Sequence, residues 1–165
     1  MWEHIEFGKI ADFKNGINFE KQQKGDNGIP TIDVKNMYSD SCYVNTNDLY
    51  RVNKILDPDY YLIKGDLLFV RSSLKEEGVG WTSLFNGESK SVTFCGFIIR
   101  ARIKEESREE IDPKYLTYFF RSDIPRRELV SGSGRVAITT LTKDYLSQSK
   151  YLNLPSLNSA KSPMY

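Results

Sequence analysis

Apolar residues recur at helical spacing in the last third of the chain. Four of them would share one broad face of a helix: Tyr115, Leu116, Phe119 and Phe120. Asp112 is a favourable N-cap, and Pro113 suits the first helical position. The pattern therefore predicts a helix that begins after residue 112 and packs its aromatic face into the core.

Two further helices are predicted beyond it. Asp123 and Pro125 can begin the second, which would bury Leu129 and Val130. The sequence Ser-Gly-Ser-Gly at 131–134 ends it, because glycine accepts the left-handed backbone of a helix end.

The segment after these glycines is expected to be a flexible loop that carries Arg135. Thr142 then caps a short third helix, and a strand leads from that helix to Pro155.

The first two thirds of the chain show the alternating or continuous apolar runs of strands. The predicted strands cover residues 29–34, 60–63, 67–70, 79–85 and 91–103. Asn86-Gly87 is expected to form a hairpin turn, residues 14–16 a loop with positive φ, and residues 49–56 a short helix. The predicted fold is α+β, a twisted and mostly antiparallel β region followed by a helical layer in a single domain.

Composition agrees with a globular protein. The chain has 165 residues, of which 27% are charged and 13% aromatic, enough for one domain with a sizeable core. No apolar run approaches the length of a membrane span, and residues 1–15 lack a signal-peptide pattern, so we expect a cytoplasmic protein. Cys42 and Cys95 lack metal-ligand spacing and are expected to be reduced core thiols.

The charge is nearly balanced but unevenly distributed. A net charge of +1 argues against a strong free-standing nucleic-acid binder. Residues 111–165 nevertheless hold eight lysines and arginines against four acidic residues, which permits a positive face near the helices.

The predicted loops are rich in side chains that bind DNA. Arginine can pair with guanine edges, asparagine with adenine edges, and glycine-rich backbone can approach a phosphate. We expect contacts first from the segment after Phe69 and from the 131–135 segment. The candidate DNA-binding residues are Lys14, Asn15, Asn18, Lys35, Asn36, Arg71, Ser72, Ser73, Lys75, Ser131, Ser133 and Arg135.

An enzymatic alternative rests on a short motif. Asp59, Glu88 and Lys90 resemble the PD…(D/E)xK pattern of metal-dependent nucleases. Glu88 follows the predicted turn, however, whereas that pattern places its second acid on a buried strand. His4 is the only histidine, and neither a P-loop nor a methyltransferase motif is present, so we expect a non-enzyme without metal or cofactor.

Several motifs follow one another along the chain. They are Trp2 with Phe7–Ile10, Phe13–Gly16 with Phe19, Gly28–Pro30 with Asn36, Lys64–Phe69 with Arg71–Ser73, and, after residue 114, the run YL-x-YF-x-RS, RR-x-L, SGSG, ITTL and L-x-LPSL. Their order and spacing resemble a target recognition domain from the specificity (S) subunit of a Type I restriction–modification system, and the match runs from Trp2 to Leu157.

The resemblance implies a domain that recognises one half of a bipartite site in double-stranded DNA. A partner modification subunit, the methyltransferase, would supply adenine methylation and its cofactor, and a motor subunit would supply cleavage. Residues 1–157 form the expected domain. Residues 158–165 are a polar tail where the family continues into the long conserved spacer helix that docks the modification subunit. A truncated protein-interaction remnant without DNA binding is the remaining alternative.

Overall fold

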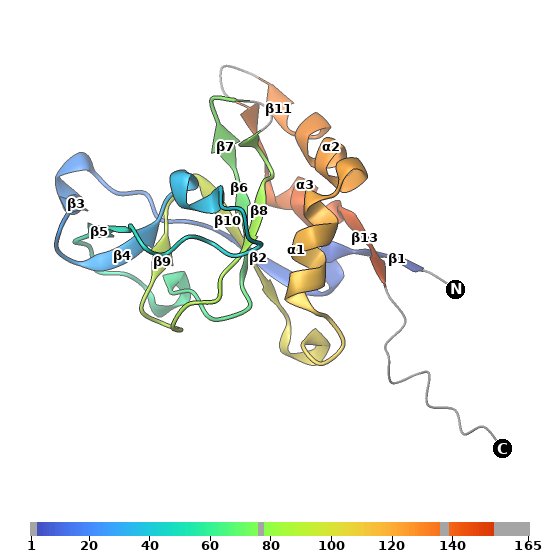
Figure 1. The fold of residues 1–165 in the computed structure, drawn as a ribbon, viewed down its shortest axis with the longest axis horizontal. Coiled ribbons are helices and arrows are strands. Elements are labelled where there is room, and N and C mark those ends of the chain that lie inside the picture. Colours follow the sequence, from blue (N-terminus) through green and yellow to red (C-terminus); the bar gives the residue numbers. More distant parts are fainter. Residues whose placement is uncertain (1–2, 76–77, 136–138, 154–165) are drawn as a thin grey trace.

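The protein is built around a four-stranded antiparallel sheet in the order β2-β10-β6-β8 (Figure 1). Its strands are β2 (Ala11–Asn15), β6 (Leu67–Val70), β8 (Thr82–Leu84) and β10 (Ile98–Ile103). The computed structural model describes residues 3–75, 78–135 and 139–153. Trp2, Pro155, the expected domain boundary at 157 and the tail 158–165 lie outside these residues.

Both faces of the central sheet are buried. Leu67, Phe69 and Ile99 belong to one hydrophobic cluster, together with residues of the helices. Leu68 and Val70 belong to a second cluster on the opposite face. This double burial explains why residues 67–70 form a continuous apolar run rather than an alternating one.

A second sheet, in the order β3-β5-β4-β9, lies on the side of the central sheet opposite the helices, at the left of Figure 1. Its strands are β3 (Lys24–Gly25), β4 (Ile29–Ile32), β5 (Tyr50–Val52) and β9 (Thr93–Phe94). The β4–β9 pair is parallel, whereas the other pairs in this sheet are antiparallel. Short 3-10 helices connect the strands of the molecule: η1 (Phe7–Lys9), η2 (Lys21–Gln23), η3 (Val34–Met37), η4 (Pro58–Tyr60) and η6 (Glu105–Ser107).

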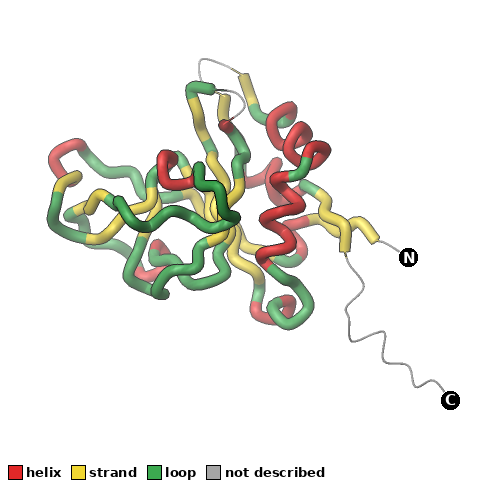
Figure 2. The backbone as a smooth tube through the Cα atoms, in the orientation of Figure 1, coloured by secondary structure: helices red, strands yellow, loops and turns green. Residues whose placement is uncertain are grey.

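The helices gather on the other side of the central sheet (Figure 2). They are α1 (Pro113–Arg121), α2 (Asp123–Ser131) and α3 (Lys143–Gln148). The predicted caps are confirmed, because Asp112 accepts from the Lys114 N–H and Thr142 from the Tyr145 N–H. Leu116 and Phe120 are fully buried, which confirms the apolar face of the first helix.

Two small sheets complete the fold. β1 (Glu3–Glu6) pairs antiparallel with β13 (Lys150–Asn153) near both ends of the described chain. β7 (Ser72–Ser73), β11 (Gly134–Arg135) and β12 (Thr139–Thr140) form a three-stranded sheet in the order β11-β12-β7. The predicted α+β class is confirmed. Within the described residues, no helix has the length and hydrophobicity that crossing a membrane requires.

The predicted loop at residues 14–16 is wrong. Lys14 and Asn15 lie on β2, where they pair with Arg100 and Ile99 of β10. Gly16 does not have a positive φ. It is required instead for close approach, because a Cβ there would lie 1.9 Å from the Cys95 carbonyl oxygen.

Four other local predictions are wrong, two of them because pairing with distant strands decides the structure. Residues 50–52, within the expected helix 49–56, form β5 and pair with β3 and β4. The expected strand 60–63 begins at the end of η4 and forms no strand. Residues 86–87 do not close a hairpin, because β8 pairs with β6 and β9 pairs with β4. Arg135, expected on a loop, has its backbone on β11.

Candidate nucleic-acid interface

Several strand ends meet at one end of the central sheet. β2 and β6 run parallel to each other on either side of β10, so their last residues lie beside its first residues. The β7-β12-β11 sheet extends beyond this end, at the top of Figure 1. We call this region the strand-end surface and define it as Asn15, Asn18, Arg71, Phe97, Lys75 and the strands β7, β11 and β12.

Arg71 is anchored on this surface by its backbone. Its N–H donates to the Phe97 carbonyl at 2.7 Å, and its own carbonyl accepts from the Leu141 N–H at 2.8 Å. The guanidinium is half-buried and donates from Nη1 to the Gly96 carbonyl at 3.2 Å. Its buried Nε has no hydrogen-bond partner among the described residues, so the group keeps unused donor capacity.

The two segments expected to carry DNA contacts are joined by strand pairing. Ser72 and Ser73 on β7 pair with Thr140 and Thr139 on β12, and β12 pairs with β11. The hydroxyls of Ser72 and Thr140 share a hydrogen bond of 3.4 Å. Residues after β6 and after α2, which lie 68 positions apart at Ser72 and Thr140, thus form one unit.

Asn15, the last residue of β2, and Asn18, three residues later, lie on the same surface. The Asn15 side-chain oxygen is buried without a hydrogen-bond partner in the described part of the chain. Asn18 is exposed and packs on the 95–97 turn, since a Cβ at Gly96 would lie 2.2 Å from its Oδ1. Lys75 follows β7 and is also exposed.

Other predicted residues make contacts within the fold. Lys35 pairs with Asp48 at 3.0 Å in an exposed ion pair. Asn36 is buried, accepts from the Asp33 N–H and donates to the Asp48 carbonyl. At the end of α2, Ser131 is exposed and donates to the Glu128 carbonyl, whereas Ser133 is buried.

The side chain of Arg135 lies outside what the structure describes, although its backbone is on β11. The structure therefore brings together Asn15, Asn18, Arg71, Ser72, Ser73, Lys75 and the backbone of Arg135. It leaves Lys14, Lys35 and Asn36 away from this group.

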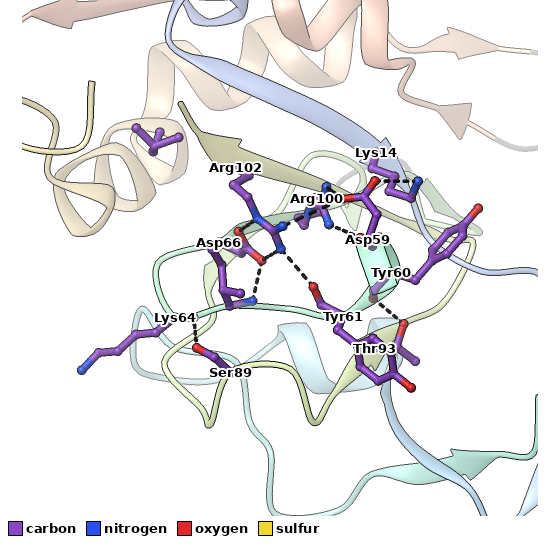
Figure 3. A network of polar contacts seen from close by, with 12 residues as sticks. Lys14, Asp59, Tyr60, Tyr61, Lys64, Asp66, Ser89, Thr93, Arg100 and Arg102 are labelled. Carbon is purple, nitrogen blue, oxygen red and sulfur yellow. Dashed lines mark hydrogen bonds and ion pairs between the residues drawn. The ribbon is translucent and has the colours of Figure 1, made fainter. Parts of the chain in front are cut away.

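Lys14 belongs to a polar network beside the central sheet (Figure 3). Its ammonium lies 2.9 Å from Asp59 and 4.2 Å from the centre of the Tyr60 ring. The hydrogen bond from Lys14, helped by the charge of the nearby Arg100, lowers the pKa of Asp59. Burial lowers the pKa of the Arg100 guanidinium, which donates to the Asp59 backbone carbonyl.

Asp66 is the buried anchor of the same network. Its carboxylate is 1% exposed and accepts from Nε and Nη2 of Arg102, both at 2.8 Å. It also accepts from the Ile63 N–H at 2.9 Å, which closes the turn before β6. The Lys64-Gly65-Asp66 sequence therefore has a structural role.

The nuclease hypothesis gains no support from this geometry. The Asp59 carboxylate is already bound by Lys14 and Arg100. Glu88 and Lys90 are exposed on a turn, and Lys90 has a φ of 67°. Across residues 3–75, 78–135 and 139–153, no three metal-ligating side chains are grouped in a way that would hold an ion.

Phe97 is a residue that sequence reasoning missed. The sequence predicts one strand over residues 91–103, but residues 95–97 form the connection between β9 and β10, and Phe97 is 58% exposed. Cys95, at the base of this turn, is buried. Burial, reinforced by Asp33, raises the pKa of its thiol to about 12.

A large cavity lies away from the strand-end surface. It has a volume of about 710 Å³ between the α1–α2 junction, α3 and the β1–β13 pair. Its apolar lining includes Phe119, Ile124, Pro125 and Tyr145, and none of the predicted DNA-binding residues lines it.

Comparison with known proteins gives a likeness of fold. No protein-family model and no curated protein sequence matches this chain. A solved structure from a type I R-M system, studied for its complex assembly and conformational transition, matches with a TM-score of 0.63 and 15% identity over 96% of this chain and 35% of its own.

Two S-subunit structures match similarly. The Type I S subunit from M. genitalium has a TM-score of 0.61 and 14% identity over 92% of this chain and 34% of its own. The HsdS subunit from Thermoanaerobacter tengcongensis has a TM-score of 0.62 and 18% identity over 96% of this chain and 34% of its own. The chain therefore spans about a third of the length of these proteins and shares the fold of that third.

Proposed function

We propose that this chain is a target recognition domain of a Type I restriction–modification system. It binds a short sequence in one half of a bipartite site in double-stranded DNA and catalyses no reaction itself. The observation that carries the proposal is the match of 92–96% of the chain to the fold of S subunits. The motif order from Trp2 to Leu157 supports it independently.

The strand-end surface is the proposed DNA contact. Arg71 carries donors suited to a guanine edge, and Asn18 carries an exposed amide suited to adenine. Lys75 is exposed and suited to a phosphate, which positions the protein without carrying sequence information. The backbone anchoring of Arg71 reduces the freedom that binding would otherwise remove.

The proposed partner is a modification subunit, which would methylate adenine in the cytoplasm at sites that this domain selects. A motor subunit would cleave unmodified DNA. Because the chain spans only a third of an S subunit, assembly needs the segments that the other two thirds of those proteins contain.

Selection from a random duplex pool tests the proposal. The full chain should enrich one short sequence, and fluorescence anisotropy should measure its affinity at low salt. Arg71→Ala should weaken binding to that sequence by about 1–3 kcal/mol and relax preference at one base pair.

Lys64→Ala is the matched control, because Lys64 is exposed at the opposite end of β6. It should leave sequence preference unchanged. Absence of any enriched sequence would overturn the proposal.

A further inference from the structure

Phe97 is exposed and belongs to neither hydrophobic cluster of the described residues. Its side chain is 58% exposed, whereas Gly96 and Ile98 on either side are buried. An aromatic ring left this far in water loses the favourable free energy that burial would provide. Its location on the strand-end surface places an apolar group among polar donors.

The backbone of Phe97 is held on several sides. Its carbonyl accepts from the Arg71 N–H at 2.7 Å, and the Ile98 N–H donates to the Cys95 carbonyl at 3.1 Å. Gly96 is packed against Asn18. The turn joins two strands that are both paired in sheets, so the ring projects from a rigid support.

The strand register places Phe97 directly opposite Arg71. Ile98 of β10 pairs with Val70 of β6. One residue beyond this pair, Phe97 before β10 therefore lies opposite Arg71 after β6. Opposed residues of an antiparallel pair project to the same face, with Cβ atoms about 4.5–5.5 Å apart. Successive base pairs are about 3.4 Å apart along the duplex, so two such side chains can contact adjacent base pairs.

We propose that the Phe97 ring contacts the C5-methyl group of a thymine in the major groove, next to the base pair that Arg71 contacts. This inference rests on the proposed DNA-recognition function. The thymine methyl is the apolar group on the major-groove edges of unmodified DNA, and an apolar side chain is what recognises it. Phe97 is thus a specificity-determining residue.

Replacement of thymine by deoxyuridine removes only that methyl group. In the duplex selected from the random pool, each thymine is replaced in turn, and the dissociation constant of the full chain is measured. One position should weaken binding about fourfold, the ratio that corresponds to burial of a single methyl group. Phe97→Ala should bind the thymine and uracil duplexes equally, whereas Phe97→Leu should keep part of the preference.

Ile55→Ala is the matched control, because Ile55 is 99% exposed and follows β5 of the other sheet. This variant should retain the fourfold ratio. Thermal unfolding should show that Phe97→Ala, an exposed change, remains folded.

Two results would overturn the inference while the proposed function stands. In the first, the selected duplex is bound but no thymine-to-uracil change matters. In the second, Phe97→Ala keeps the fourfold ratio between the thymine and uracil duplexes, whether or not its affinity for both falls by the same factor. That result is expected if the ring stacks on bases or packs on a partner protein. A pool without any enriched sequence overturns both together.

Discussion

At the scale of single residues, position 16 requires glycine because a Cβ has no room there, not because the backbone has a positive φ. A Cβ at this position would lie 1.9 Å from the Cys95 carbonyl oxygen and 2.6 Å from that of Phe94, and both are backbone atoms. Gly16→Ala must therefore separate β2 from the 94–95 segment. We expect a loss of about 3 kcal/mol in the free energy of unfolding, the upper range for overpacking, measured by urea denaturation.

Gly25→Ala provides the comparison. Gly25 lies on β3, and a Cβ there would have no atom within 4 Å. The Gly25→Ala variant should differ from the unsubstituted protein by no more than about 0.5 kcal/mol in the free energy of unfolding. Equal effects of the two substitutions would show that close approach does not explain Gly16.

At the scale of elements, the buried Asp66 joins the turn before β6 to β10. Asp66→Asn removes the charge that binds Arg102 and leaves the guanidinium without its bidentate partner. Breaking a fully buried pair costs roughly 3–5 kcal/mol, and because Arg102 keeps 22% side-chain exposure we expect about 2 kcal/mol. Denaturant unfolding measures the loss.

Asp48→Asn makes the same chemical change in an exposed ion pair. Asp48 is 88% exposed where it meets Lys35, so its loss should cost no more than about 1 kcal/mol. A loss as large as that of Asp66→Asn would contradict the assigned structural role of the buried carboxylate.

The helices were predictable because their signals are local. Asp112 and Thr142 act within three residues of their own positions, and the apolar face of α1 repeats within three turns. β2 and β5 were not predictable, because their partners lie far away in sequence. Lys14-Asn15-Gly16 has the composition of a turn, yet pairing of residues 14 and 15 with β10 overrides that preference.

The candidate site was predictable by residue type but not by arrangement. Arg71 and the 131–135 segment were chosen because of their side chains and glycines, while the β7–β12 pairing that joins them depends on the whole fold. Phe97 was missed because residues 91–103 were predicted as one strand, and the sequence does not show that β9 ends at Phe94 and β10 begins at Ile98.

At the scale of the whole molecule, the number of cations near the strand-end surface limits how many phosphates it can bind. The net charge is +1, and Asp59 and Asp66 already bind Lys14, Arg100 and Arg102. The cationic residues that the sequence places in the strand-end surface are Arg71, Lys75 and Arg135. A surface with so few cations cannot draw most of its affinity from counterion release.

Two or three phosphate contacts correspond to a slope of about −2 to −3 when log K is plotted against log salt concentration. Anisotropy titrations of the full chain between low and moderate salt measure this slope. Lys75→Ala should make it less negative by about 1 and weaken every duplex alike, whereas Lys64→Ala should leave it unchanged. A slope of about −6 or steeper would require many more cations than this surface holds, so the DNA contact would have to lie on another face of the molecule.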